Sequence, residues 1–350
     1  MPIQYTFTMS RYREIADDIR KYIESGSCST GSRLPTENEY SKAYKASRQT
    51  IRDALAVLRS EGLIYQIQGS GTYVRHGIRK KGKAMTVEVI STYISDYIFP
   101  SIIRGIEESL SGKGIYIRLA ATGNMVERER SILSGILDSD DIDALIVEGT
   151  RTSIPNPDIP LFEALQRKGI PIVFLHSSYP ELEDAVVVGM DDIEGGRKAV
   201  RHLIAKGCRR IGGIFKSDDR QGLMRYRGFS EEIIGSGIGL ENSYAGFYTT
   251  EKAADGITFS EKEIRKLSGY DGLVLYNDQT ALSLIRDSRR YSLPVPEIAS
   301  FDRSILNTGL TDMFYSLGHR KEELGRAAAE KIARMLDGRK EDSLILSWID

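Results

Sequence analysis

The sequence has 350 residues, of which 41% are hydrophobic and 28% are charged, so it is long enough for two or three globular domains with a sizeable core. It contains no run of about 18 apolar residues, and its start lacks a basic flank followed by an apolar core, so we expect neither a membrane span nor a signal peptide. The two cysteines, Cys28 and Cys208, are far apart and have no metal-binding spacing, which indicates a reducing cytoplasm.

The formal net charge of −1 conceals an uneven distribution of charge along the chain. Residues 1–84 contain 15 Lys and Arg against 8 Asp and Glu, whereas the rest of the chain contains 33 against 41. A basic head on an acidic body indicates that a polyanion is bound at one end. A solvated basic face is the alternative, and a motif is needed to decide between them.

The head contains the pattern of a helix-turn-helix. An apolar stripe predicts a first helix over 11–25, and Thr36 with Glu39 has the spacing of a capping box at the start of a second. Ser47 is expected to cap a third helix that ends at Gly62. The first turns of this helix carry Arg48, Gln49, Thr50 and Arg52. At the amino end of a recognition helix these side chains would meet base edges in the major groove, where Arg pairs with guanine and Gln with adenine.

Two short β-rich runs, 63–68 and 71–74, flank a glycine-rich tip and predict a wing. Glycines at the tip would let the backbone approach phosphates or the minor groove. The following segment RHGIRKKGK is typical of a flexible linker whose charge can follow the DNA backbone. We therefore expect a winged helix-turn-helix domain (α+β) over 1–77, a basic linker over 78–84 and a second domain over 85–350.

From Met85 onward, buried strands alternate with helical segments. Strands are expected at 86–92, 114–121, 143–149, 169–176 and 185–190, and then at 209–215, 246–248, 271–277, 297–301 and 313–319, with a last helix over 321–336. This α/β alternation predicts two consecutive doubly wound lobes, each a parallel sheet covered on both faces. Ligands of such sheets bind at the carboxyl ends of the strands, so we expect a cleft between the lobes.

The expected cleft lacks the motifs of nucleotide sites and of common hydrolases. We find no G-x-G-x-x-G, no G-K-[ST] loop, no G-x-S-x-G and no histidines at metal-binding spacing, so no cofactor or metal is expected. The strand ends instead carry polar and aromatic side chains that suit sugar hydroxyls and ring faces: Tyr93, Asp96, Tyr97, Glu148, His176, Asp191, Asn277 and Asp302. For the tyrosines the alternative is core packing, for Asp96 it is helix capping, and for Asp191 it is ordering of the hinge between the lobes.

At this point the head resembles the GntR family of DNA-binding domains. It contains the L-P-T-E-x-E start, the S-R-x-T-I-R recognition helix and the Q-G-x-G-T-Y-V wing. The resemblance implies that Glu37, Arg48, Arg52, Gln68 and Gly69 contact DNA.

The body, over 85–350, resembles the LacI/GalR branch of periplasmic-binding-protein-like receptors. The motifs are R-Y-R-G-F, Y-N-D-Q-T-A-L, S-F-D-R-S and H-R-K-E-E-L-G. They imply that Arg225, Asn277 and Asp302 contact the effector and that His319 or Lys321 lies near the cleft.

A GntR head on such a body is typical of arabinose repressors, as is the segment STYISDYIFPSIIRGIE. The resemblance implies a repressor that binds double-stranded operator DNA as a homodimer and is released by L-arabinose, with another pentose or hexose as the alternative effector. A sugar transport receptor would need export, and a sugar-converting enzyme would need a catalytic pair that no spacing indicates. We therefore do not expect an enzyme.

Overall fold

The structure is a computed structural model. The residues that it describes are 11–25, 28, 32–61, 63–67, 70–74, 84–95, 97–139, 141–253, 256–304, 306 and 313–350. Apart from Ala84, the expected linker over 78–84 therefore lies outside the described residues.

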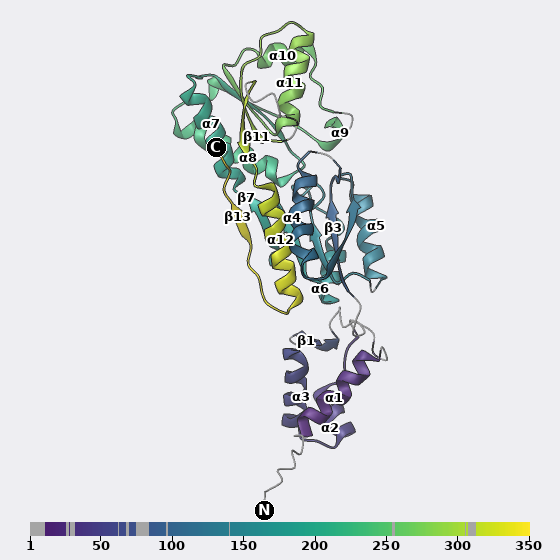
Figure 1. The fold of residues 1–350 in the computed structure, drawn as a ribbon. Coiled ribbons are helices and arrows are strands. Elements are labelled where there is room, and N and C mark those ends of the chain that lie inside the picture. Colours follow the sequence, from purple (N-terminus) through teal and green to yellow (C-terminus); the bar gives the residue numbers. More distant parts are fainter. Residues whose placement is uncertain are drawn as a thin grey trace, which may run out of the picture.

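The head has the expected order of elements. It consists of α1 (Arg11–Glu24), α2 (Glu37–Tyr44), α3 (Arg48–Ser60), β1 (Ile64–Ile67) and β2 (Gly71–Val74) (Figure 1). The two strands pair in antiparallel register from Ile64 opposite Val74 to Ile67 opposite Gly71. Apolar side chains of all three helices and both strands form one core beneath this hairpin. The winged helix-turn-helix is thereby confirmed.

Local capping fixes the start of both short helices. The Thr36 hydroxyl accepts a hydrogen bond from the Glu39 N–H, and the Glu39 carboxylate accepts one from the Thr36 N–H at 2.7 Å. The Ser47 hydroxyl accepts from the Thr50 N–H at 3.1 Å. Each cap satisfies amides that the first helical turn leaves free. The recognition helix therefore begins at Arg48, where Arg48, Gln49 and Arg52 are exposed and Ile51 is buried.

The first lobe is built on a six-stranded parallel sheet with the order β13-β7-β6-β5-β3-β4. Its helices lie on both faces, with α4 and α12 on one and α5 and α6 on the other. The elements are β3 (Met85–Ser91), α4 (Phe99–Ser111), β4 (Ile115–Ala121), α5 (Val126–Leu137), β5 (Ala144–Val147), α6 (Ile159–Arg167), β6 (Ile172–Leu175), β7 (Val186–Met190), α12 (Lys321–Leu336) and β13 (Leu344–Leu346).

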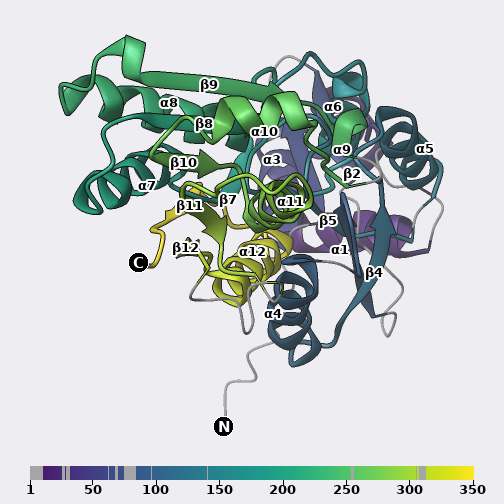
Figure 2. The same cartoon turned by 90° about the horizontal axis from the view of Figure 1, so that it is seen from above.

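The second lobe repeats this plan on a five-stranded parallel sheet with the order β12-β11-β10-β8-β9, which can be followed in Figure 2. Helices α7 and α8 cover one face, and α10 and α11 cover the other. The elements are α7 (Asp192–Ala205), β8 (Ile211–Lys216), α8 (Arg220–Gly235), β9 (Ser243–Tyr248), α9 (Thr250–Ala253), α10 (Glu261–Leu267), β10 (Gly272–Leu275), α11 (Asp278–Arg290), β11 (Glu297–Asp302) and β12 (Tyr315–Gly318). The sequence analysis missed α9, α10 and β13.

The sequence predicts two lobes that follow one another along the chain. The structure corrects this, because the chain returns to the first lobe after it has formed the second. Helix α7 follows a strand of the first lobe but packs on α8 of the second, whereas α12 follows a strand of the second lobe but packs on α4 of the first (Figures 1 and 2). The chain then continues through β13 back to the second lobe, where Ile349 pairs with Gly318. The described chain thus crosses the hinge after β7, after β12 and after β13.

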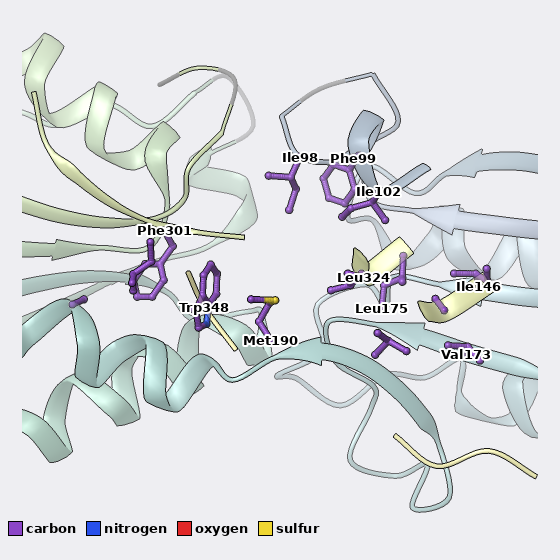
Figure 3. Packing of buried hydrophobic residues seen from close by; sticks show 14 of the residues in the cluster. Ile98, Phe99, Ile102, Ile146, Val173, Leu175, Met190, Phe301, Leu324 and Trp348 are labelled. Carbon is purple, nitrogen blue, oxygen red and sulfur yellow. The ribbon is translucent and has the colours of Figure 1, made fainter. Parts of the chain in front are cut away.

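Glycines allow the exchanged helices to approach closely. A Cβ on Gly325 of α12 would overlap the backbone oxygen of Ile102 on α4, and one on Gly228 of α8 would overlap that of Ile193 on α7. An apolar core runs from these helix pairs through the hinge, and Figure 3 shows Met190 and Trp348 between the apolar side chains of the two lobes. The hinge is therefore part of a continuous core.

We predict that Gly325→Ala lowers the free energy of unfolding by about 2–3 kcal/mol, because the added methyl group forces α12 away from α4. Gly135 is a suitable control, since it lies within α5 and a Cβ there meets nothing within 4 Å. Gly135→Ala should raise the stability by about 0.5–1 kcal/mol through helix propensity. Urea unfolding of both variants checks the pair, and equal effects would refute the close approach.

Candidate functional site

The outward face of α3 places the expected base-reading side chains together. Arg48, Gln49 and Arg52 are exposed, and Thr50 is partly exposed. The Arg52 Nε donates to the Glu37 Oε2 at 2.9 Å, so the two helices hold their proposed DNA contacts as an ion pair. Because both members are more than a third exposed, this pair contributes little to stability and remains available to another partner.

Two further residues of the expected DNA site, Gln68 and Gly69, lie outside the described residues. Their flanking strands are described and form the antiparallel hairpin expected of a wing. The contacts of Glu37, Arg48, Gln49, Thr50, Arg52, Gln68 and Gly69 with DNA therefore stay predictions.

A cavity of about 480 Å³ lies between the lobes, at the carboxyl ends of strands from both sheets. Seven of the residues expected from the sequence line it: Tyr93, Tyr97, Glu148, His176, Arg225, Asn277 and Asp302. The first four belong to the first lobe and the last three to the second. Arg225 lies within α8, and the other six end or follow a strand, as expected for ligand sites of such sheets. The cavity therefore has two walls, one from each lobe.

Arg225 is the most deeply buried cation of the cavity, with 1% of its surface exposed. Its Nε donates to the Asp192 Oδ1 at 2.9 Å, and its Nη1 donates to the backbone oxygen of Tyr276 at 2.5 Å. The guanidinium also lies 4.9 Å from the ring centre of Trp348. These partners offset the desolvation of a buried charge and fix its orientation.

Asp302 has one occupied and one available carboxylate oxygen. The Tyr97 hydroxyl donates to Oδ2 at 2.5 Å and accepts from the Asp278 N–H at 3.2 Å, so Tyr97 joins the two lobes. The Oδ1 is buried, lies 3.6 Å from Arg225 Nη2 and has no hydrogen-bond partner among the described residues. A buried acceptor without a hydrogen bond is costly even beside a positive charge, so this oxygen is suited to a ligand hydroxyl.

Glu148 and His176 form the opposite wall. The Glu148 carboxylate accepts from the Thr92 N–H at 2.8 Å and from the Thr92 hydroxyl at 2.5 Å. Burial nevertheless raises the pKa of Glu148 to about 7 and lowers the pKa of His176 to about 3. His176 is thus neutral near pH 7, and neither of its ring nitrogens has a hydrogen-bond partner among the described residues. One ring nitrogen can donate to a ligand and the other can accept.

Three residues of the cavity have strained backbones. Tyr97, His176 and Asp302 have φ angles of 66°, 63° and 92°, in the region that side chains with a Cβ rarely adopt. Such conformations persist where the surroundings over-determine them, and they concentrate at functional sites. The strain supports the assignment of this cavity as a binding site.

Three expected residues lie outside the cavity lining, and one is not described. Asp191 accepts from the Glu194 N–H and caps α7, while the next residue, Asp192, turns inward to Arg225. His319 is buried in the hinge with its ring 5.3 Å from that of His176, and the Lys321 Nζ donates to the backbone oxygen of Asp302 at 2.6 Å. These two lie behind the cavity wall, where they contact residues that line it. Asp96 lies outside the described residues.

The sequence analysis missed several polar groups of the cavity. Lys216 and Asp219 line it and form an ion pair at 2.6 Å, and the rings of Tyr248 and Tyr276 lie beside them. Lys216 ends the buried strand β8 and Asp219 follows it, so the strand-end rule was sufficient to find them. Asp192 could also have been predicted. The spacing from Asp191 to Glu194 is typical of a helix cap, so Asp191 is the capping residue and the carboxylate of Asp192 is left for another role.

Comparison with known proteins agrees with both halves of the molecule. Residues 11–74 match the family of bacterial regulatory proteins of the gntR type, and residues 200–346 match the periplasmic-binding-protein-like domain. The arabinose metabolism transcriptional repressor of Halalkalibacterium halodurans is 36% identical over 95% of this chain and 91% of its own length. The repressor of the same name from Geobacillus stearothermophilus is 35% identical over 96% of this chain and 94% of its own length. The chain belongs to this family of transcriptional repressors.

Members of this family are regulators that bind DNA, and this repressor combines a GntR head with a sugar-responsive body rather than an enzyme domain. The body has the fold of a LacI-type regulator from Alkaliphilus metalliredigens QYMF solved with D-xylulofuranose, with a TM-score of 0.64 and 20% identity over 76% of this chain and 97% of that one. The chain as a whole also resembles the CelR–cellobiose complex in fold, with a TM-score of 0.63 and 21% identity over 90% of this chain and 98% of that one. Among the described residues, no helix is long and apolar enough to span a membrane.

The raised pKa of Glu148 predicts a pH dependence of stability. Between its ordinary value of 4.5 and the folded value of about 7, the folded protein keeps a proton that the unfolded chain loses. Stability should therefore fall as the pH rises through this window, with a slope of at most about 1.4 kcal/mol per pH unit. Glu148→Gln should remove that part of the slope.

Urea unfolding of wild type and Glu148→Gln from pH 4.5 to pH 8 checks this prediction. Burial also raises the pKa of Asp192, to about 6, and this group acts in the same direction in both proteins. The difference between the two curves therefore isolates Glu148. Parallel curves would mean that the folded carboxyl titrates near its ordinary pKa.

Proposed function

We propose that L-arabinose is the effector and that it binds in the cavity between the lobes. The main support is the pair of relatives that are 36% and 35% identical and carry arabinose metabolism in their names. The cavity supplies the chemistry that a small polyol needs. The Oδ1 of Asp302 can accept from a hydroxyl, and the neutral imidazole of His176 can donate to one. Partly exposed Tyr93 offers a ring face to the C–H groups of the sugar.

The remaining residues of the site have proposed roles that follow from their positions. Arg225 and Asn277 face the same cavity and would donate to hydroxyls beside Asp302, and Glu148 would accept from the opposite wall. We place His319 and Lys321 as supports of this wall because they contact His176 and Asp302. Another pentose or a hexose is the alternative effector, since the same groups recognise any ring that presents hydroxyls on two sides.

We further propose that the repressor is a homodimer on a pseudo-palindromic operator. One recognition helix reads one half-site, and two-fold symmetry of the protein would match that of the DNA. Sugar would favour the closed arrangement of the lobes and thereby move the two heads out of register with the half-sites. A coupling free energy of about 1–3 kcal/mol corresponds to a 5- to 150-fold loss of operator affinity.

Calorimetric titration against pentoses and hexoses tests the effector, and we expect L-arabinose to bind most tightly. Asp302→Asn should weaken this binding about 10- to 150-fold, because it removes a charged acceptor worth about 1.5–3 kcal/mol. Asp271→Asn is a matched control, since Asp271 accepts backbone hydrogen bonds from Arg209 and Arg210 away from the cavity. Unchanged affinity in Asp302→Asn would refute this site, and tighter binding of another sugar would refute the ligand.

Arg52→Ala should weaken binding to an operator selected from random DNA by about 1–3 kcal/mol and relax the preference at one base pair. Fluorescence anisotropy against the selected operator and single-base variants measures both effects, and the stoichiometry should be two chains per operator. Arg265→Ala removes an equal charge from α10 of the second lobe and serves as the control. If specificity is retained while affinity falls, Arg52 contacts phosphate instead of a base.

A further inference from the structure

Loops of the two lobes contact each other directly along one side of the cavity. The Ser153 hydroxyl, after β5, donates to the backbone oxygen of Ser217, after β8, at 2.5 Å. The Ser153 N–H donates to the backbone oxygen of Asp218 at 3.3 Å, and the Arg220 N–H donates to the Thr152 hydroxyl at 3.0 Å. The two loops are thus joined by direct hydrogen bonds, which need no ligand to bridge them.

A buried amide extends this contact inward. The Asn124 Nδ2, after β4, donates to the Thr250 hydroxyl at the start of α9 at 2.6 Å. Asn124 is 1% exposed and Thr250 is 7% exposed. The Asn124 Oδ1 accepts from the Arg151 N–H at 3.0 Å, so the amide is satisfied on both sides. Breaking a buried hydrogen bond of this kind costs free energy unless both groups become hydrated when the lobes separate.

An ion pair extends the contact outward. The Arg151 Nη1 lies 2.6 Å from the Glu251 Oε1, and the Arg151 Nε donates to the backbone oxygen of Asn124. Glu251 is mostly exposed, so the pair alone is weak. Asn124 and Arg151 both have positive φ angles, of 58° and 48°. The two loops therefore hold unfavourable backbone conformations at the place where they meet the other lobe.

These contacts define a group that we call the latch: Asn124, Arg151, Thr152, Ser153, Ser217, Asp218, Arg220, Thr250 and Glu251. We propose that the latch determines how sensitive the repressor is to its sugar, by stabilising the closed arrangement of the lobes through direct contacts between them. Asn124, Thr152 and Thr250 of the latch also line the cavity, so the proposal is tested at latch residues that do not. Arg151, Ser153 and Glu251 belong to the latch but do not line the cavity. The proposal rests on the proposed function in one respect, namely that sugar binds to the closed arrangement.

The physical argument is one of populations. A ligand that binds a closed form has an apparent dissociation constant equal to the intrinsic one divided by the closed fraction. Weakening the latch lowers that fraction and leaves the intrinsic contacts intact. Every sugar that binds the closed form should therefore lose affinity by the same factor. A residue that touched the sugar would instead change the ratio between sugars, because it reads particular hydroxyls.

Ser153→Ala and Glu251→Arg should each raise the apparent dissociation constant about 3- to 10-fold for L-arabinose and for a second binding sugar from the panel, with the ratio unchanged. The sugar concentration that releases operator DNA should rise by the same factor, and operator affinity without sugar should not fall. The double variant Arg151→Glu with Glu251→Arg restores the ion pair with its charges exchanged, so its affinity for the sugar should return toward that of wild type. Lys252→Ala is the control, since Lys252 is next to Glu251 in α9 but pairs with Glu263 within the second lobe.

The arrangement of the lobes can be measured without sugar. In full-length repressor with Cys28→Ser, spin labels on Glu127→Cys and Lys262→Cys report the distance between exposed sites on the two lobes. Ser153→Ala should shift this distance distribution toward longer values, and Lys252→Ala should not. An unchanged distribution, or a changed ratio between sugars, overturns the latch. Failure of every sugar to bind wild type would overturn the proposed function instead, and the distance measurement would still decide on the latch.

Discussion

A buried guanidinium imposes the central constraint on the body of this repressor. Arg225 can remain charged inside the protein only while anions and carbonyls surround it. Its partners come from the start of α7 (Asp192), the end of β10 (Tyr276) and the end of β11 (Asp302), and Trp348 covers it from beyond the last hinge crossing. One side chain therefore joins the cavity to two of the segments that connect the lobes. A ligand that pairs with Asp302 changes the environment of the same charge that orders the hinge.

The cavity and the hinge are consequently not separate parts. His319 lies at the second crossing, Trp348 follows the third, and their rings are 5.5 Å apart, while His319 also contacts His176 on the cavity wall. Tyr97 reaches from the first lobe to Asp302 in the second. Ligand binding and movement of the lobes must therefore share residues, which is the physical requirement for a receptor that reports occupancy to a distant DNA-binding head.

Local patterns in the sequence were enough to predict features that depend on neighbouring residues. The caps at Thr36 and Ser47, the two lobes and the strand-end positions of Glu148 and Asn277 follow from spacing and periodicity. The sequence did not predict β13, because a strand of three residues is recognisable only from its partner β7, more than 150 positions earlier. The contacts between the loops along one side of the cavity were missed for the same reason. Ser153 and Ser217 are ordinary loop serines until the fold brings them together.

The exchange of helices between the lobes has a consequence for how the protein is made. When a ribosome has finished β7, the first lobe has five of its six strands but neither α12 nor β13, since both follow the second lobe in the sequence. Leu324, Ala328 and Ile332 of α12 complete the core over β5 and β6. The part of the sheet's apolar face over β5 and β6, which α4 does not cover, therefore stays exposed while the second lobe is synthesised. The lobe that begins first is thus finished last, and the nascent chain depends on a helix made after the second lobe to cover apolar surface of the first.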